Sequence, residues 1–192
     1  LVAGQSAWAD LDGTSREEML VTPVAMHVQL DGAESKEGTG VATALLRLRE
    51  ALDDARAFSK NKPNYERNAM RELAPSRLDL EALVQVLGGK LRTVIQVQRA
   101  ADISACLALA KEFGLKLVVA GGLEAWKVRD QLAQAACPVI LNPLSNLPES
   151  FDSLGARADN AKLLHEAGVT IAFTTQETHN ARKLRQVAGN AV

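Results

Sequence analysis

Several features that mark specialised protein classes are scarce in this 192-residue sequence. Aromatic residues make up 4% of the chain and the net charge is −1 at pH 7, so we expect neither a base-stacking platform nor a basic surface for phosphates. No apolar run approaches the length of a membrane span. The composition therefore predicts an ordinary globular protein that has neither nucleic acid nor a membrane as its partner.

Cysteine is also rare. The two cysteines, Cys106 and Cys137, lie in apolar stretches and are too few for a disulfide framework. We expect buried free thiols, with a disulfide between them as the alternative. The chain opens with Leu1, and no basic segment followed by an apolar run marks a signal peptide. We therefore expect a chain that is either processed or a piece of a longer protein.

The chain after about residue 90 alternates between short apolar strands and helices. Strand patterns occur at 93–97, 115–120, 138–141 and 169–173, and helical patterns follow at 101–113, 124–135, 159–167 and 180–188. Four such units predict an α/β fold with parallel strands, each followed by a helix. Because the strands are apolar nearly throughout, we expect both faces of the sheet to be covered. Periodicity alone allows either an open doubly wound sheet or a closed barrel.

The chain before residue 90 is less regular, so we divide the protein into segments 1–90 and 91–192. A strand is possible at 24–30, and a polar, glycine-rich loop follows it. The strongest helical pattern in the chain covers 41–59 and is expected to end at Asn61-Lys62-Pro63-Asn64. A second helix is predicted over 78–87, before Gly88-Gly89.

Candidate ligand-binding residues follow the predicted strands, because function in a parallel α/β sheet is found at the carboxyl ends of strands. Gln96 and Gln98 share one face of the first strand and could orient a ligand, or could satisfy neighbouring backbone groups. Gly121 precedes a helix and could admit an anion to its N-terminus, or could form a tight turn. Gln176 follows the fourth strand and completes this set.

Candidate catalytic residues are few. Glu177 and His179 follow the fourth strand and could form an acid–base pair, although a solvated carboxylate and a helix-capping histidine are the simpler interpretation. The remaining histidines are His27 and His165, and no His or Cys spacing matches a metal motif. We therefore expect no complete catalytic constellation, no metal site and no cofactor in this chain.

Five segments of the second half follow one another as in a known family. These segments are 96–103, 112–119, 121–128, 138–141 and 179–182, and a looser match covers 3–5 and 47–58. In this order they resemble the amidohydrolase superfamily, in particular its imidazolonepropionase-like members. The resemblance implies a (β/α)8 TIM-type barrel, of which 1–90 would be an irregular and helical segment from the middle and 91–192 would supply strands five to eight. The chain would then be an internal fragment of a longer protein. It also implies zinc as the family cofactor and hydrolysis of amides or peptides by metal-activated water.

The resemblance further implies metal ligands that this chain lacks. The family's fifth-strand motif, His-x-His-Arg-Ala-x-Asp-Ile, has Gln96 and Gln98 in place of both histidines. The sixth-strand histidine corresponds to 120–121, and the eighth-strand aspartate to 175–176, where no imidazole or carboxylate occurs. Neutral amides give up the charge and the imidazole nitrogen that hold zinc. We therefore expect a degenerate amidohydrolase, acting as a non-catalytic partner or as a small-molecule binding module.

Two other functions stay open. An active metal-dependent amidohydrolase would take ligands from upstream of Leu1 and from Glu177 or His179, and an unrelated α/β binding domain would differ in strand order. Half a barrel exposes unpaired strand edges, so we expect a homo-oligomer or a complex with a paralogue. Export to the periplasm is implied by the resemblance alone, with the cytoplasm as the alternative.

Overall fold

The computed structural model describes residues 2–9, 20–30, 40–144, 148, 153–175 and 178–191. The chain forms two compact units, which are described separately. The first contains Leu1–Thr93 together with Leu109–Lys116, and the second contains Val94–Ala108 together with Leu117–Val192. The division into segments 1–90 and 91–192 stays a prediction, because compactness is not evidence that either segment folds alone.

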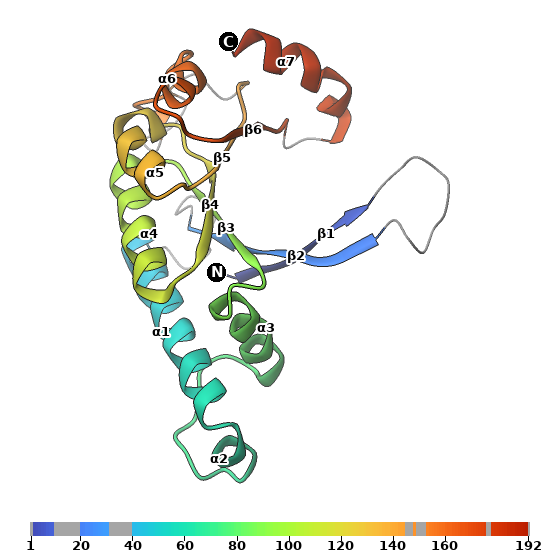
Figure 1. The fold of residues 1–192 in the computed structure, drawn as a ribbon, viewed down its shortest axis with the longest axis vertical. Coiled ribbons are helices and arrows are strands. Elements are labelled where there is room, and N and C mark those ends of the chain that lie inside the picture. Colours follow the sequence, from blue (N-terminus) through green and yellow to red (C-terminus); the bar gives the residue numbers. More distant parts are fainter. Residues whose placement is uncertain are drawn as a thin grey trace. The chain divides into compact units, whose positions relative to one another are not determined.

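The first unit begins with an antiparallel pair of strands, β1 (Val2–Ala9) and β2 (Leu20–Gln29) (Figure 1). The expectation of an irregular start with a strand only at 24–30 is therefore wrong. The register of β1 shifts between Val2 and Gly4, and Gly4 has a φ of 123°. Such irregularities interrupt the alternation of apolar and polar residues that would otherwise reveal a strand.

Three helices complete the first unit, α1 (Val41–Lys60), α2 (Lys62–Glu66) and α3 (Arg77–Leu87). The spacing of apolar residues explains α1, whose buried positions Leu48, Leu52, Ala55 and Phe58 recur every three or four residues. The Ser76 side chain accepts a hydrogen bond of 3.3 Å from the Asp79 N–H and so caps α3. The buried core of this unit includes Met26, Val86 and Leu91.

The second unit carries the four predicted strands, each followed by helical structure. In chain order the elements are β3 (Arg92–Val97), α4 (Ala100–Phe113), β4 (Lys116–Gly121), η1 (Ala125–Val128), α5 (Arg129–Gln134), β5 (Val139–Leu141), α6 (Asn160–Glu166), β6 (Ile171–Phe173), η3 (Thr178–Lys183) and α7 (Leu184–Asn190). Neighbouring strands follow chain order, β3-β4-β5-β6, and both β4–β5 and β5–β6 are parallel. This order is that of a barrel wall, because a doubly wound sheet reverses its strand order at a switch point.

The two faces of this parallel sheet differ in burial. Val119 and Val139 pair in register and are fully buried, and Figure 1 shows α4, α5 and α6 along one side of β4 to β6. On the other face, Ala120 pairs with Ile140 and Ile140 with Ala172, and these side chains are half-buried or exposed. The expectation that both faces are covered is therefore wrong for this face.

Both thiols lie in the core of the second unit. Cys106 and Cys137 are free and buried, as predicted. Burial raises the pKa of Cys106 to about 12 and that of Cys137 to about 11, so both stay protonated at neutral pH. Among the helices that the structure describes, none has the length and apolar character required to cross a bilayer.

Candidate functional site

The ends of β3 and β4 are tied together by Gln98. Its side-chain oxygen Oε1 accepts a hydrogen bond of 3.4 Å from the Leu123 N–H. Its backbone carbonyl accepts one of 2.9 Å from the Glu124 N–H, and the Val97 carbonyl accepts one of 2.8 Å from the Gly122 N–H. The chain that leaves β4 is therefore fixed against the end of β3, and the single oxygen of the Gln98 amide already accepts one hydrogen bond.

Gly121 lies directly against the Gln98 amide. Its φ is +90°, and a Cβ at this position would lie 2.6 Å from both Oε1 and Nε2 of Gln98. Gly122, with a φ of +58°, follows it. Only a residue without a side chain fits both the backbone conformation and the space. The structure thus brings two of the predicted ligand-binding residues into contact at the end of β4.

Gln96 has a different environment. It is half-buried in β3, between the buried Ile95 and Val97. With the other residues that the structure describes, the side-chain amide of Gln96 forms no hydrogen bond, in contrast to that of Gln98. Its amide therefore offers both a donor and an acceptor at the sheet, and it stays a candidate for ligand binding.

Glu124 is a residue of this region that the sequence did not single out. Its Oε2 accepts a hydrogen bond of 3.1 Å from the Ala100 N–H at the start of α4, and its Oε1 lies 2.6 Å from Lys127 Nζ. Burial alone would raise the pKa of Glu124, but these hydrogen bonds, with the positive charges of Lys127 and Arg99, lower it. Its position just after the diglycine turn was the only sequence signal.

Asn160 is a second such residue. It is 4% exposed at the start of α6, where its Oδ1 accepts a hydrogen bond of 3.1 Å from the Trp126 N–H. Its Nδ2 donates one of 3.0 Å to the Gly122 carbonyl. Asn160 thereby joins α6 to the turn after β4. A lone asparagine at a helix start normally indicates a cap, so no sequence pattern indicates this role.

The segment before α6 is held against the same turn through Trp126. The indole Nε1 donates a hydrogen bond of 2.9 Å to the Gly155 carbonyl, and the Arg157 guanidinium lies 4.7 Å from the ring centroid. The cavity between Gly121, Asn142 and Asn160 measures about 10 Å³, which is about the size of one water. Side chains and backbone therefore fill this part of the strand ends.

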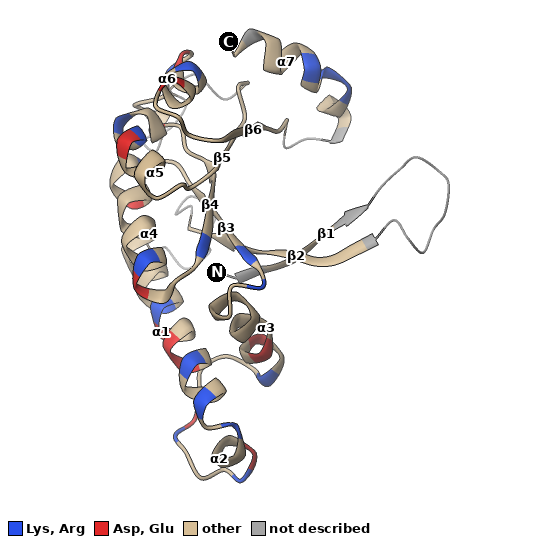
Figure 2. Cartoon of the chain, in the orientation of Figure 1, with Lys and Arg blue, Asp and Glu red and all other residues tan. Residues whose placement is uncertain are grey.

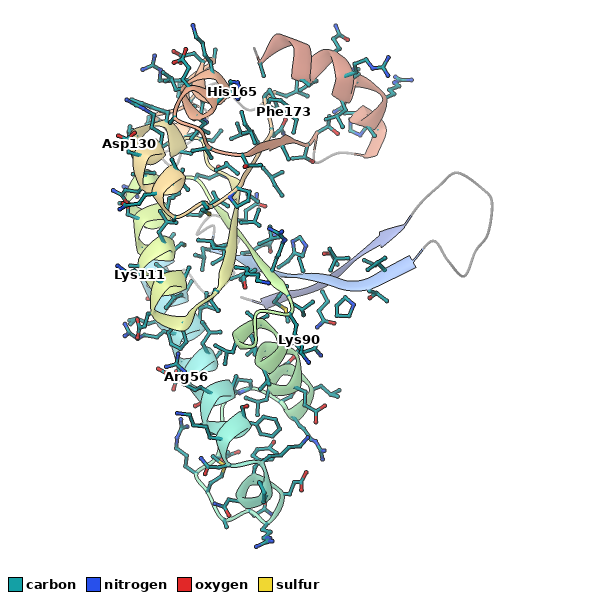
Figure 3. All side chains as sticks on the ribbon, viewed as in Figure 1. Arg56, Lys90, Lys111, Asp130, His165 and Phe173 are labelled. Carbon is teal, nitrogen blue, oxygen red and sulfur yellow. The ribbon has the colours of Figure 1, made fainter. Side chains whose placement is uncertain are left out.

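The predicted residues after β6 are less completely defined. Gln176 and Glu177 lie outside the described residues, so the proposed acid–base pair stays a prediction. His179 is exposed in η3, and His165, labelled in Figure 3, is exposed on α6. Across the described ranges, no three His, Cys, Asp or Glu residues are grouped closely enough to hold a metal ion.

Comparison with known proteins supports the barrel. A crystal structure of an amidohydrolase from Thermotoga maritima matches 92% of this chain with a TM-score of 0.77 at 23% sequence identity. The fold is part of a TIM-type barrel. Amidohydrolase tasK from Hapsidospora irregularis is 33% identical over 85 residues, which is 41% of this chain. No family model matches the sequence.

Both matches extend well beyond this sequence. The chain spans 48% of the Thermotoga amidohydrolase and 9% of the Hapsidospora protein. The comparisons therefore support a resemblance to amidohydrolases in general. The imidazolonepropionase-like subfamily and the numbering of β3 to β6 as barrel strands five to eight stay predictions.

Proposed function

We propose that this chain is a non-catalytic barrel segment of an amidohydrolase-type protein, which binds a small molecule and does not hydrolyse it. The observation that carries the proposal is the state of Gln98. Its amide stands at the strand end where the family resemblance places a metal-binding histidine, and its Oε1 accepts a hydrogen bond from the Leu123 N–H. This amide oxygen carries no formal charge and already accepts one backbone hydrogen bond, which makes it a weaker metal ligand than a histidine nitrogen.

The chemistry of the neighbouring residues points the same way. Structural and catalytic zinc sites are built from imidazole, thiolate and carboxylate groups. The described strand ends offer the amides of Gln96 and Gln98, and Gly121 has no side chain. The nearby carboxylate of Glu124 is engaged by the Ala100 N–H and by Lys127. These residues do not fit zinc, so they do not supply the metal-activated water on which hydrolysis in the family depends.

Gln96 is the residue that we assign to ligand binding. It is half-buried on a regular strand, and its amide can donate two hydrogen bonds and accept two. The strand fixes the backbone of Gln96, so that only its side chain has to be ordered when a ligand binds. An amide, peptide or carboxamide group of a ligand would complement it.

The first experiment measures metal and activity. The purified 192-residue chain is incubated with zinc, dialysed and analysed for metal, and is then assayed on dipeptides and N-acyl amino acids beside the Thermotoga maritima amidohydrolase. We expect less than stoichiometric zinc and no hydrolysis above the buffer rate. Stoichiometric zinc with turnover would refute the proposal. Loss of that turnover on replacing Glu177 and His179 by Ala would then establish the alternative, an active hydrolase.

The second experiment measures binding. The melting temperature of the chain is recorded with the C-terminal amides of the same dipeptides and N-acyl amino acids, because a ligand that binds the folded state raises it and an amide group is what Gln96 would complement. Gln96→Ala should abolish the shift caused by a binding compound. Gln85→Ala, at an exposed glutamine of α3, is the matched control and should retain the shift. Equal shifts in the two variants would exclude Gln96 as the binding residue.

A further inference from the structure

A basic pocket lies beside β6 in the second unit. Its volume is about 650 Å³, and it is shallow and open to solvent, because four of its six lining residues are exposed. Phe173, the last residue of β6, forms one wall and is labelled in Figure 3. The other lining residues come from η3 and α7 and are Ala181, Arg182, Leu184, Arg185 and Ala188.

The charged residues that the structure describes on η3 and α7 are all basic. Residues 178–192 contain Arg182, Lys183 and Arg185 and neither Asp nor Glu. In Figure 2, all the coloured charges on η3 and α7 are therefore those of Lys and Arg. Within the part of the chain that the structure describes, neither guanidinium of the pocket pairs with a carboxylate. Arg157, by contrast, forms an ion pair of 2.6 Å with Asp159. The pocket therefore presents two cations that no described side chain neutralises.

The remaining lining is apolar. Phe173 is half-buried, Leu184 is 38% exposed, and Ala181 and Ala188 add only methyl groups. A guanidinium offers two parallel N–H groups that match the two oxygens of a carboxylate. An aromatic ring and a leucine beside it favour an apolar group on the same ligand.

We propose that this pocket binds a carboxylate that carries an apolar side chain, of the size of an N-acyl amino acid. The two arginines would hold the carboxylate, and Phe173 and Leu184 would contact the side chain. The site is separate from the Gln98–Gly121 contact, and it does not require that the chain has lost hydrolytic activity. Two cations on a chain of net charge −1 do not favour a nucleic acid.

Calorimetric titration of the 192-residue chain tests the charge requirement. N-acetyl-L-leucine is compared with N-acetyl-L-leucinamide, which has the same shape without the charge, and with inorganic phosphate. We expect the acid to bind more tightly than the amide by up to about 25-fold, because each of the two exposed ion pairs contributes a factor of up to about five. Phosphate should bind more weakly than the acid. Equal binding of the acid and the amide would overturn the proposal, as would tighter binding of phosphate.

Substitutions test the residues. Arg182→Gln combined with Arg185→Gln should weaken binding of the acid about tenfold or more, whereas Lys183→Gln, beside the pocket but not lining it, should change it less than about twofold. All three side chains are exposed, so the urea midpoint should stay unchanged and report intact folding. Arg182→Lys keeps the charge and should bind better than Arg182→Gln. Unchanged affinity in the double variant, or equal losses with Lys183→Gln, would assign binding elsewhere.

Discussion

Gly121→Ala is the substitution that most sharply tests the contact between β3 and β4. Gly121 is buried with a φ of +90°, and an added Cβ would lie 2.6 Å from Gln98 Oε1 and Nε2. Two separate costs follow from this geometry. The backbone must hold a side chain in a left-handed conformation, and the Gln98 amide must move away from the new methyl group.

The magnitudes of these costs can be estimated separately. A left-handed conformation costs a residue with a side chain about 1–2 kcal/mol. Displacing the Gln98 amide also removes its hydrogen bond from the Leu123 N–H, which costs about 1 kcal/mol. We therefore expect Gly121→Ala to lower the free energy of unfolding by about 2–3 kcal/mol. When Gln98 is already Ala, only the backbone cost of about 1–2 kcal/mol should remain.

Urea unfolding of the wild type, both single variants and the double variant measures this difference as a coupling energy. Gly168→Ala is the control, because Gly168 has a φ of +80° and no atom within 4 Å of an added Cβ. It should show the backbone cost alone, with or without Gln98. If Gly121→Ala costs the same in both Gln98 backgrounds, within about 0.5 kcal/mol, the contact between Gly121 and Gln98 is not as described.

Three further predictions concern the buried polar groups and thiols. Asn160→Ala leaves the Trp126 N–H without its partner and removes one of the two hydrogen bonds to the Gly122 carbonyl, which keeps the one from the Ala125 N–H. It should lower the free energy of unfolding by about 2–4 kcal/mol, against less than about 0.5 kcal/mol for the exposed Asn64→Ala; similar losses in urea would contradict this. Burial raises the pKa of Glu124, but its hydrogen bonds and the neighbouring positive charges outweigh burial and lower it. Its contribution to stability is therefore present above the unfolded-state pKa and is lost as the pH falls through the folded-state pKa. Glu124→Gln should lose less stability than the wild type in urea titrations from about pH 7 to about pH 3, and parallel curves would count against the role of its charge. The pKa of Cys106, about 12, and that of Cys137, about 11, should keep both thiols unreactive toward an aromatic disulfide reagent at about pH 8 until urea unfolds the chain, whereas immediate labelling in native buffer would contradict their burial.

The regular part of the fold could be predicted from local patterns. The four strands of the second unit are apolar runs rich in β-branched residues, and each was located to within one or two residues at either end. β1 was missed because its irregular register at Gly4 interrupts the alternation. α2 was missed because Pro63 was interpreted as the end of α1, although proline in the first turn also starts a helix.

The candidate site could be predicted only in part, because its contacts are tertiary. Gln98 and Gly121 were each selected for following a strand, but their contact depends on β3 and β4 being neighbours in the sheet. Asn160 and Glu124 were missed because each acts on a backbone group more than 20 residues away. Nothing in the residues next to them in sequence indicates those partners.

The measurement that tests the central claim most directly is zinc-edge anomalous diffraction from crystals of the 192-residue chain grown with excess zinc. We expect no anomalous peak at the ends of β3 to β6, and we expect Gln98 Oε1 to accept its hydrogen bond from the Leu123 N–H. A zinc ion coordinated at these strand ends, with the Gln98 amide turned toward it, would contradict the claim that the Gln98 oxygen serves the backbone of the fold and not a metal ion.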